Sequence, residues 1–317
     1  AHSWNGKYRR PAGLATPDFE QPMKGELLWV YEGLTQYLGY LLAARSGMWT
    51  PETFRDYVAD TAMFMQNNQG RRWRPLVDTA RSVQLLYGTG RNWRASRRST
   101  DYYWESMLVW LEADTIIRQR SGGKKSLDDF LKAFHGGSNT GPQVRPYTQR
   151  DVVLALNAIT PYDWNGFFKT RVYDIAPEIP LGGITNSGWR LVYTAEPNPY
   201  TAGVEKSRGV RNFLASIGFS IAENAVIEDV RPGSPAALAG LSPNMVLVDK
   251  DGKDLKPDAV EAAIKAAAGG TSKILFTADV AGVKRNVAVD YNGGIRYPHL
   301  VRIDGTTDLL SDISRAH

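Results

Sequence analysis

The chain has 317 residues and no cysteine, which excludes disulfides, thiolate metal ligands and a cysteine nucleophile. Its 43% hydrophobic content allows a sizeable core, and its length suggests about two domains. The net charge is only +5, from 38 basic and 33 acidic residues, so the composition does not indicate a nucleic-acid partner. No apolar run approaches the roughly 20 residues that a membrane span needs.

The first half of the chain has the pattern of a helical domain. Apolar residues recur at helical spacing, and several helices open with a capping residue followed by proline or an early acid. Residues 26–175 are therefore helical in pattern, interrupted by a broken Arg-rich stretch at 69–99 and a polar loop at 136–146. The clearest helices are about 26–47, 50–66, 101–120 and 126–134, with another start at Thr148 and a short helix at Phe167-Phe168.

A single acid, Glu32, stands in the apolar and aromatic start of the first predicted helix, directly before Gly33. Glycine inside a helix costs about 1 kcal/mol relative to alanine. We therefore expect another element to approach the chain closely at Gly33. On helical spacing alone, Glu32 is most simply a surface carboxylate of an amphipathic helix.

The composition changes at Gly182-Gly183, after which short β-branched segments dominate. We expect three parts: a helical domain at 1–183, a β-rich domain at 184–290, and a tail at 291–317 that packs back on the body. The predicted strands are 189–194, 217–221, 225–230, 246–249, 273–278 and 284–289, and the predicted helices among them are 235–239 and 257–267.

Residues 186–290 resemble a PDZ domain. The segment 233–241 closely resembles the corresponding segment of bacterial protease PDZ domains, although Asn244-Met245 stands where those have Gly-Asp. Asparagine tolerates the left-handed conformation that this turn needs. The resemblance implies a small, partly open β-barrel with two helices that binds a peptide C-terminus by β-augmentation. The carboxylate-binding loop would be Ser216, Ile217, Gly218 and Phe219.

Five further segments occur in the order found in the M61 family of zinc metalloaminopeptidases, the glycyl aminopeptidase-like enzymes, which the chain as a whole resembles. They are His2–Pro11, Glu32-Gly33-Leu34-Thr35, Asp101-Tyr102-Tyr103, Gly122–Asp129 and Tyr297–Leu300. The resemblance implies a multidomain α + β fold. A mainly α-helical C-terminal part of a thermolysin-like, gluzincin-type metallopeptidase domain would precede the PDZ domain.

The same resemblance implies a site. His2 would be the second zinc ligand and Glu32 the third, while Tyr103, or alternatively Tyr102, would donate a hydrogen bond to the oxyanion. The enzyme would remove small N-terminal residues, Gly or Ala, from peptides by attack of a zinc-activated water. The first histidine of the family's His-Glu-x-x-His motif, and the glutamate that acts as its general base, would precede Ala1. We therefore expect a fragment that is inactive without the upstream part of the same protein.

Several alternatives stay open. The two tyrosines would, without the resemblance, be an aromatic pair that packs at a helix start. The PDZ module would be either the working part of a non-catalytic peptide-binding protein or a domain that only packs on its neighbour. Tryptophans are interleaved among arginines over residues 71–98, a mixture that could bind nucleic acid by phosphate pairing and base stacking. Because 33 acidic residues nearly balance 38 basic ones, a solvated Arg-rich loop is the favoured interpretation. The residues do not indicate a compartment, and the family resemblance weakly favours the periplasm or secretion.

Overall fold

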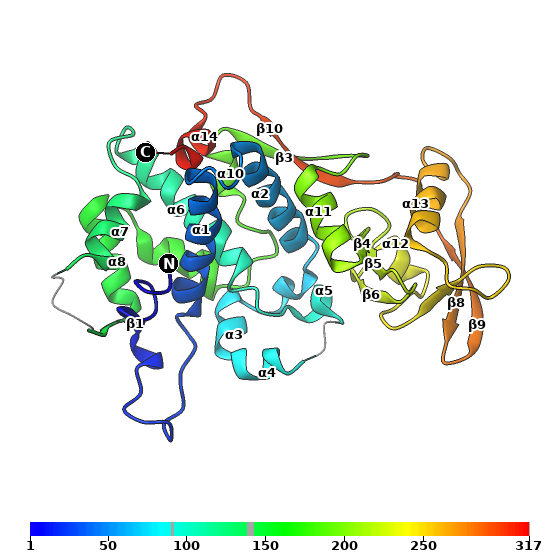
Figure 1. Ribbon diagram of the computed structural model, residues 1–317, viewed down its shortest axis with the longest axis horizontal. Coiled ribbons are helices and arrows are strands. Elements are labelled where there is room, and N and C mark those ends of the chain that lie inside the picture. Colours follow the sequence, from blue (N-terminus) through cyan, green and yellow to red (C-terminus); the bar gives the residue numbers. More distant parts are fainter. Residues whose placement is uncertain (90–91, 138–142, 317) are drawn as a thin grey trace.

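The computed structural model describes residues 1–89, 92–137 and 143–316. It is a mixed α/β structure with two separate hydrophobic cores. The larger core lies in a helical body, and the smaller core lies in a β-rich unit at the other end of the long axis (Figure 1). This division agrees with the predicted change from helical to β-rich sequence.

Three long helices make up the centre of the body: α1 (Leu28–Arg45), α2 (Pro51–Gln66) and α6 (Trp104–Arg120). Helix α1 packs along α6, and α2 packs against both. Two fully buried tryptophans, Trp29 of α1 and Trp110 of α6, stack with ring centroids 6.0 Å apart. The shorter helices of the body are α3 (Leu76–Arg81), α4 (Val83–Tyr87), α5 (Arg94–Arg97), α7 (Leu127–His135), α8 (Gln149–Ile159), α9 (Trp164–Phe168) and α10 (Gly182–Thr185).

The predicted helix starts are confirmed by their capping hydrogen bonds. The Thr50 hydroxyl accepts from the Thr53 backbone at the start of α2. Reciprocal capping boxes open α7 at Ser126 and α8 at Thr148. Each cap satisfies backbone donors that a helix start leaves without an intrahelical partner.

The predicted polar loop at 136–146, of which residues 138–142 lie outside the described ranges, ends in a strand that the sequence does not predict. Strand β2 (Arg145–Tyr147) pairs in parallel with β1 (Arg9–Pro11). Pro146 disfavours a helical conformation at Arg145, and the Arg145 N–H donates to the carbonyl of Tyr8. The extended N-terminal segment thereby gains a partner that ties it to the body.

The β-rich unit contains two three-stranded antiparallel sheets. One has the order β4 (Val210–Asn212), β5 (Phe219–Ala222), β6 (Ile227–Val230), and the other has the order β7 (Val246–Val248), β8 (Ile274–Val280), β9 (Val283–Val289). Two helices, α12 (Pro235–Leu238) and α13 (Pro257–Ala266), accompany them. Asn244 has φ +72°, as its place in the predicted turn requires. Strand β4 is not among the predicted elements.

The chain crosses between the two parts twice. Strand β3 (Trp189–Thr194) leads outward through α11 (Pro199–Arg208), which packs on α2, and β10 (Tyr297–Arg302) returns antiparallel to β3. The last helix, α14 (Leu309–Ser314), buries two apolar side chains in the larger core. Of the helices in the described ranges, none has both the length and the apolar character of a bilayer span.

Candidate active site

Glu32 lies in α1 where that helix approaches α6 most closely. A Cβ at Gly33 would overlap the Cβ of Ser106 and lie 3.0 Å from the carbonyl oxygen of Tyr102. The close approach that we expect from this glycine is therefore present, and α6 is the element that makes it. As a result, the residues at the start of α6 are brought beside Glu32.

His2 faces Glu32 from the N-terminal segment. The His2 Nε2 and Glu32 Oε2 atoms are 3.3 Å apart, and the two side chains are 47% and 15% exposed. The other ring nitrogen, Nδ1, is 3.1 Å from the backbone oxygen of Asn5, while the ring edge packs on Tyr31 at a centroid distance of 4.9 Å. The structure thus brings together two residues that are far apart in the sequence.

The separation of these two atoms suits a shared metal ion. Zinc bonds of 2.0–2.2 Å to nitrogen and oxygen at a tetrahedral angle place two ligand atoms about 3.3 Å apart. Burial raises the pKa of Glu32, and the neighbouring His2 opposes this shift. Within the described ranges, however, no group of three or more His, Asp or Glu side chains is placed to hold a metal. His2 and Glu32 are the two residues of the expected ligand set that come together here.

The two candidate tyrosines differ in their surroundings. Tyr103 is half-buried, and its hydroxyl lies close enough to Glu32 for the two groups to interact electrostatically. Burial raises the pKa of Tyr103, so its hydroxyl stays protonated and able to donate. Tyr102 is fully buried, with its backbone oxygen turned to Gly33. The geometry therefore favours Tyr103 over Tyr102 as a group that reaches a substrate.

The structure adds Tyr87, which the sequence does not single out. Tyr87 ends α4, is 66% exposed, and its hydroxyl lies 2.9 Å from the hydroxyl of Tyr103. Sequence spacing gives no signal for this contact, because α4 and α6 are separated in the sequence by a segment that includes α5. Tyr103 interacts with Glu32 and hydrogen-bonds to Tyr87, so the three residues form a row that begins at the candidate ligand and ends at solvent.

Part of the Arg-rich stretch forms a buried charge network beneath this row. Arg98 pairs with Asp101, with Nε 2.8 Å from Oδ2, and both Arg98 and Arg71 pair with Glu105. The expectation of a solvated Arg-rich loop is wrong for Arg71 and Arg98, each only 2% exposed. The two guanidinium groups fix the irregular segment onto the start of α6, and they are not available to phosphates.

Of the four residues expected to bind a peptide carboxylate, three lie in the turn between β4 and β5, and Phe219 begins β5. Ile217 and Phe219 are fully buried, and the backbone N–H groups of Ser216 and Gly218 both donate to the carbonyl of Phe213, at 3.0 and 2.9 Å. Strand β5 pairs with β4 on one side and with β6 on the other. A peptide could add to β5 only by displacing one of these strands, and peptide binding here stays a prediction.

Strand β4 is held in place by ion pairs as well as by backbone pairing. Arg211 pairs with Asp258 at 2.7 Å and with Glu261, both on α13, and it lies 3.5 Å from Glu205 of α11. Glu205 also accepts a hydrogen bond of 2.8 Å from the backbone of Asn212. We call these four charged residues the Arg211 cluster. It fixes β4 to helices on both sides.

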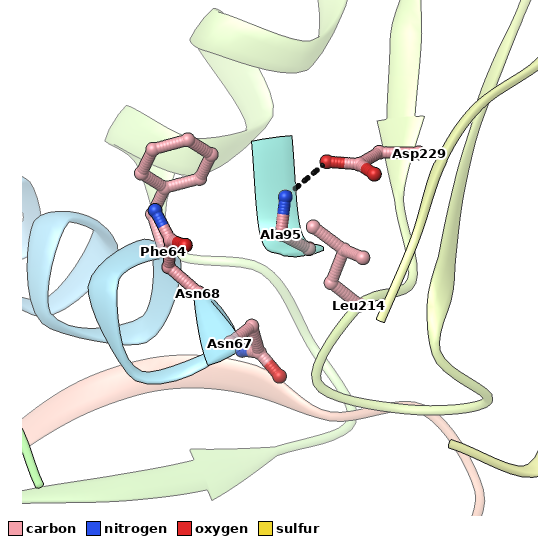
Figure 2. A pocket seen from close by; sticks show the side chains of 6 residues that line it. All are labelled: Phe64, Asn67, Asn68, Ala95, Leu214 and Asp229. Carbon is pink, nitrogen blue, oxygen red and sulfur yellow. Dashed lines mark hydrogen bonds between the residues drawn. The ribbon is translucent and has the colours of Figure 1, made fainter. Parts of the chain in front are cut away.

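A small cavity lies where the β-rich unit meets the body (Figure 2). It encloses about 10 Å³, room for about one water molecule. Asp229 accepts a hydrogen bond of 2.8 Å from the Ala95 backbone beside it, as Figure 2 shows. Its lining residues are Phe64, Asn67, Asn68, Ala95, Leu214 and Asp229. The cavity is too small for a peptide and belongs to the junction between the two parts.

The arrangement as a whole is that of an aminopeptidase-like fold. An aminopeptidase N family protein from Idiomarina loihiensis matches 98% of this chain with a TM-score of 0.75 and 19% sequence identity. At this identity the likeness is one of fold. The chain covers 52% of that protein, about half of its length.

A more particular match comes from the sequence. A family model described as M61 glycyl aminopeptidase matches residues 1–109, the part that contains His2, Glu32, Tyr87, Tyr102 and Tyr103. Among curated protein sequences, none matches the chain. The resemblance to the M61 family is thus confirmed for residues 1–109 and supports a peptidase function.

Proposed function

We propose that this chain forms part of a zinc-dependent aminopeptidase in which His2 and Glu32 are two of the metal ligands. One observation carries the proposal: the Nε2 atom of His2 and the Oε2 atom of Glu32 lie 3.3 Å apart. That separation matches two ligands of one tetrahedral ion. The M61 match at residues 1–109 includes both residues and supports the same reading.

Each residue of the site has a role in this proposal. A bound zinc ion would polarise the peptide carbonyl and lower the pKa of a water molecule. Glu32 and His2 hold the ion, and Tyr103 donates a hydrogen bond to the oxygen on which negative charge develops. A catalytic zinc site takes three protein ligands. We propose that the remaining protein ligand, the first histidine of the family's motif, and the general base come from residues that are not in this chain.

The substrates we propose are peptides with a small N-terminal residue, glycine or alanine. The description of the matching family as glycyl aminopeptidases supports this choice. The chain spans about half of the similar solved structure, so the activity belongs to the full-length protein in this proposal. Residues 1–317 alone are expected to be inactive.

The test measures hydrolysis of glycyl- and alanyl-p-nitroanilide by the full-length natural protein. Removal of zinc with a chelator should abolish activity, and added zinc should restore it. The variants His2→Ala and Glu32→Gln should lower kcat/KM roughly 100-fold or more, because each removes a metal ligand. Glu52→Gln, at an exposed position of α2, is the matched control. Activity that resists both chelation and the two ligand variants would overturn the proposal.

A further inference from the structure

We propose that Asn5 is a positioning residue that sets the orientation of His2 for metal binding. The inference rests on the proposed zinc site and deepens it. Asn5 touches neither the expected metal nor the substrate. It acts by anchoring the turn that carries His2 onto the helix that carries Glu32.

The anchor is the side-chain amide of Asn5, which is fully buried against α1. Its Nδ2 atom donates to the backbone oxygens of Val30 at 3.1 Å and Tyr31 at 2.9 Å, and to the Thr35 hydroxyl at 3.1 Å. Thr35 directs its own proton to the carbonyl of Tyr31, at 2.7 Å, so it presents a lone pair to Asn5. All three partners are acceptors around Glu32, and the amide nitrogen is the donor that suits them.

The backbone of Asn5 links its anchored side chain to the ring of His2. The Asn5 carbonyl oxygen lies 3.1 Å from Nδ1 of His2, and the N–H of Asn5 donates to the carbonyl of Ala1 at 3.0 Å. With a metal ion bound, a proton on Nδ1 would donate to that carbonyl and leave the lone pair on Nε2, the atom that faces Glu32, for the ion. A hydrogen bond from the second ring nitrogen is how proteins fix the tautomer and direction of a histidine ligand.

Little else holds the imidazole of His2. The side chain is 47% exposed, and its packing is against the ring edge of Tyr31. Tyr31 in turn occupies the space above Gly6, where any Cβ would overlap the tyrosine ring and where φ is +137°. Asn5 and Gly6 together therefore seat the turn on α1. This explains why the Trp4-Asn5-Gly6 and Glu32–Thr35 segments occur together in one chain.

The test is a titration of the metal-free full-length protein with Zn²⁺ alone, followed on the ¹⁵N-histidine-labelled protein by long-range ¹H–¹⁵N correlation spectra. In the zinc-loaded unsubstituted protein, His2 should carry its proton on Nδ1, and its Nε2 resonance should be shifted by the metal. In Asn5→Leu the tautomers should mix, and zinc affinity should fall roughly 10–100-fold. Leucine is similar in size, and the α1 carbonyls keep their helical partners, so we expect this variant to fold.

Asn67→Leu is the matched control. Asn67 is also a buried asparagine, and its amide donates to a helix carbonyl, that of Met63 at 2.8 Å. Its loss should reduce stability without changing the His2 tautomer or the zinc affinity. If Asn5→Leu does not fold, Thr35→Val decides, since it removes one acceptor of the anchor and should weaken zinc binding by a few-fold.

The outcomes separate the two proposals. If zinc leaves the His2 resonances of the unsubstituted full-length protein unchanged, the proposed zinc site fails. If zinc binds at His2 but the Asn5 variant, or Thr35→Val in its place, binds zinc equally well with the same tautomer, then Asn5 is merely structural and this inference is overturned.

Discussion

The two candidate sites of this chain differ in what their polar groups face. At His2 and Glu32, side-chain atoms from two distant segments meet 3.3 Å apart, the separation on which the proposed metal site rests. In the turn at Ser216–Phe219, two backbone N–H groups donate to Phe213 of the same chain. The first arrangement brings side chains together, while the second satisfies its backbone donors internally.

The difference follows from the kind of motif involved. A side-chain motif retains its chemistry wherever the backbone brings the residues together, and α1 and the N-terminal turn do so here. A β-augmentation motif depends on a free strand edge. The residues of the loop do not reveal whether that edge is free, and β4 occupies it in this chain. A motif match is therefore stronger support for ligand binding at the first site than at the second.

The largest expected effect on stability is that of removing a buried charge near the first site. Arg98→Ala removes the partner of Asp101 and one partner of Glu105, both buried. An uncompensated buried charge costs about 3–5 kcal/mol, and we expect that loss in the free energy of unfolding measured in urea. Lys169→Ala, which breaks an exposed pair with Asp174, should cost about 0–1 kcal/mol. Equal losses in the two variants would contradict the structural role of Arg98.

A smaller effect is expected where α1 approaches α6. Gly33→Ala forces a methyl group against Ser106, and overpacking of this kind costs about 1–3 kcal/mol. Gly39→Ala is the control in the same helix, because no atom lies within 4 Å of a Cβ there. It should stabilise the protein by up to about 1 kcal/mol through helix propensity. Thermal unfolding of both variants checks the prediction, and a shift of the same sign in both would refute it.

Local sequence signals predict most of the secondary structure. The caps at Thr50, Ser126 and Thr148 locate helix starts because the signal and its hydrogen bond lie within one turn. The glycine at position 33 also predicts a close contact, although it does not say with which element. Features of this kind are readable because a few neighbouring residues determine them.

The contacts between distant segments were not predictable in the same way. Neither the row from Glu32 to Tyr87 nor the pairing of β1 with β2 has a local signal. The sequence predicts a solvated Arg98 because arginine side chains are usually exposed. Its burial depends on two acids that follow it in the sequence, Asp101 and Glu105. The family resemblance placed His2 beside Glu32, which spacing alone does not do.

At the second site, a variant that loosens β4 tests what holds this strand on β5. Arg211→Gln removes the positive centre of the Arg211 cluster, and repulsion among its three acids should favour local opening of β4. We expect backbone amide exchange at Asn212 and Phe213 to become about tenfold faster, which corresponds to about 1.4 kcal/mol. Arg285→Gln, at an exposed position of β9, is the control. Unchanged exchange in Arg211→Gln would show that backbone pairing alone holds β4.

The smallest expected effect is the pH dependence of the same cluster. Burial raises the pKa of Glu205 to about 7, above the value of about 4.3 for an unfolded glutamate. The native state therefore binds this proton more tightly, and the stability it contributes is complete below about pH 4 and is lost as the pH rises to about 7.

Glu205→Gln keeps an oxygen that can accept from the Asn212 backbone but cannot ionise. Relative to this variant, the unsubstituted protein should lose about 1 kcal/mol of unfolding free energy between pH 4.5 and 7.5. This is less than the full shift implies, because solvent reaches the cluster at the exposed Asp258 and weakens the desolvation of Glu205. Urea unfolding across that range measures the difference, with Glu228→Gln as a control for loss of a carboxylate. If the unsubstituted protein instead gains unfolding free energy relative to Glu205→Gln as the pH rises, the ion pair with Arg211 outweighs burial. In that case β4 would be held more firmly at neutral pH than at acid pH.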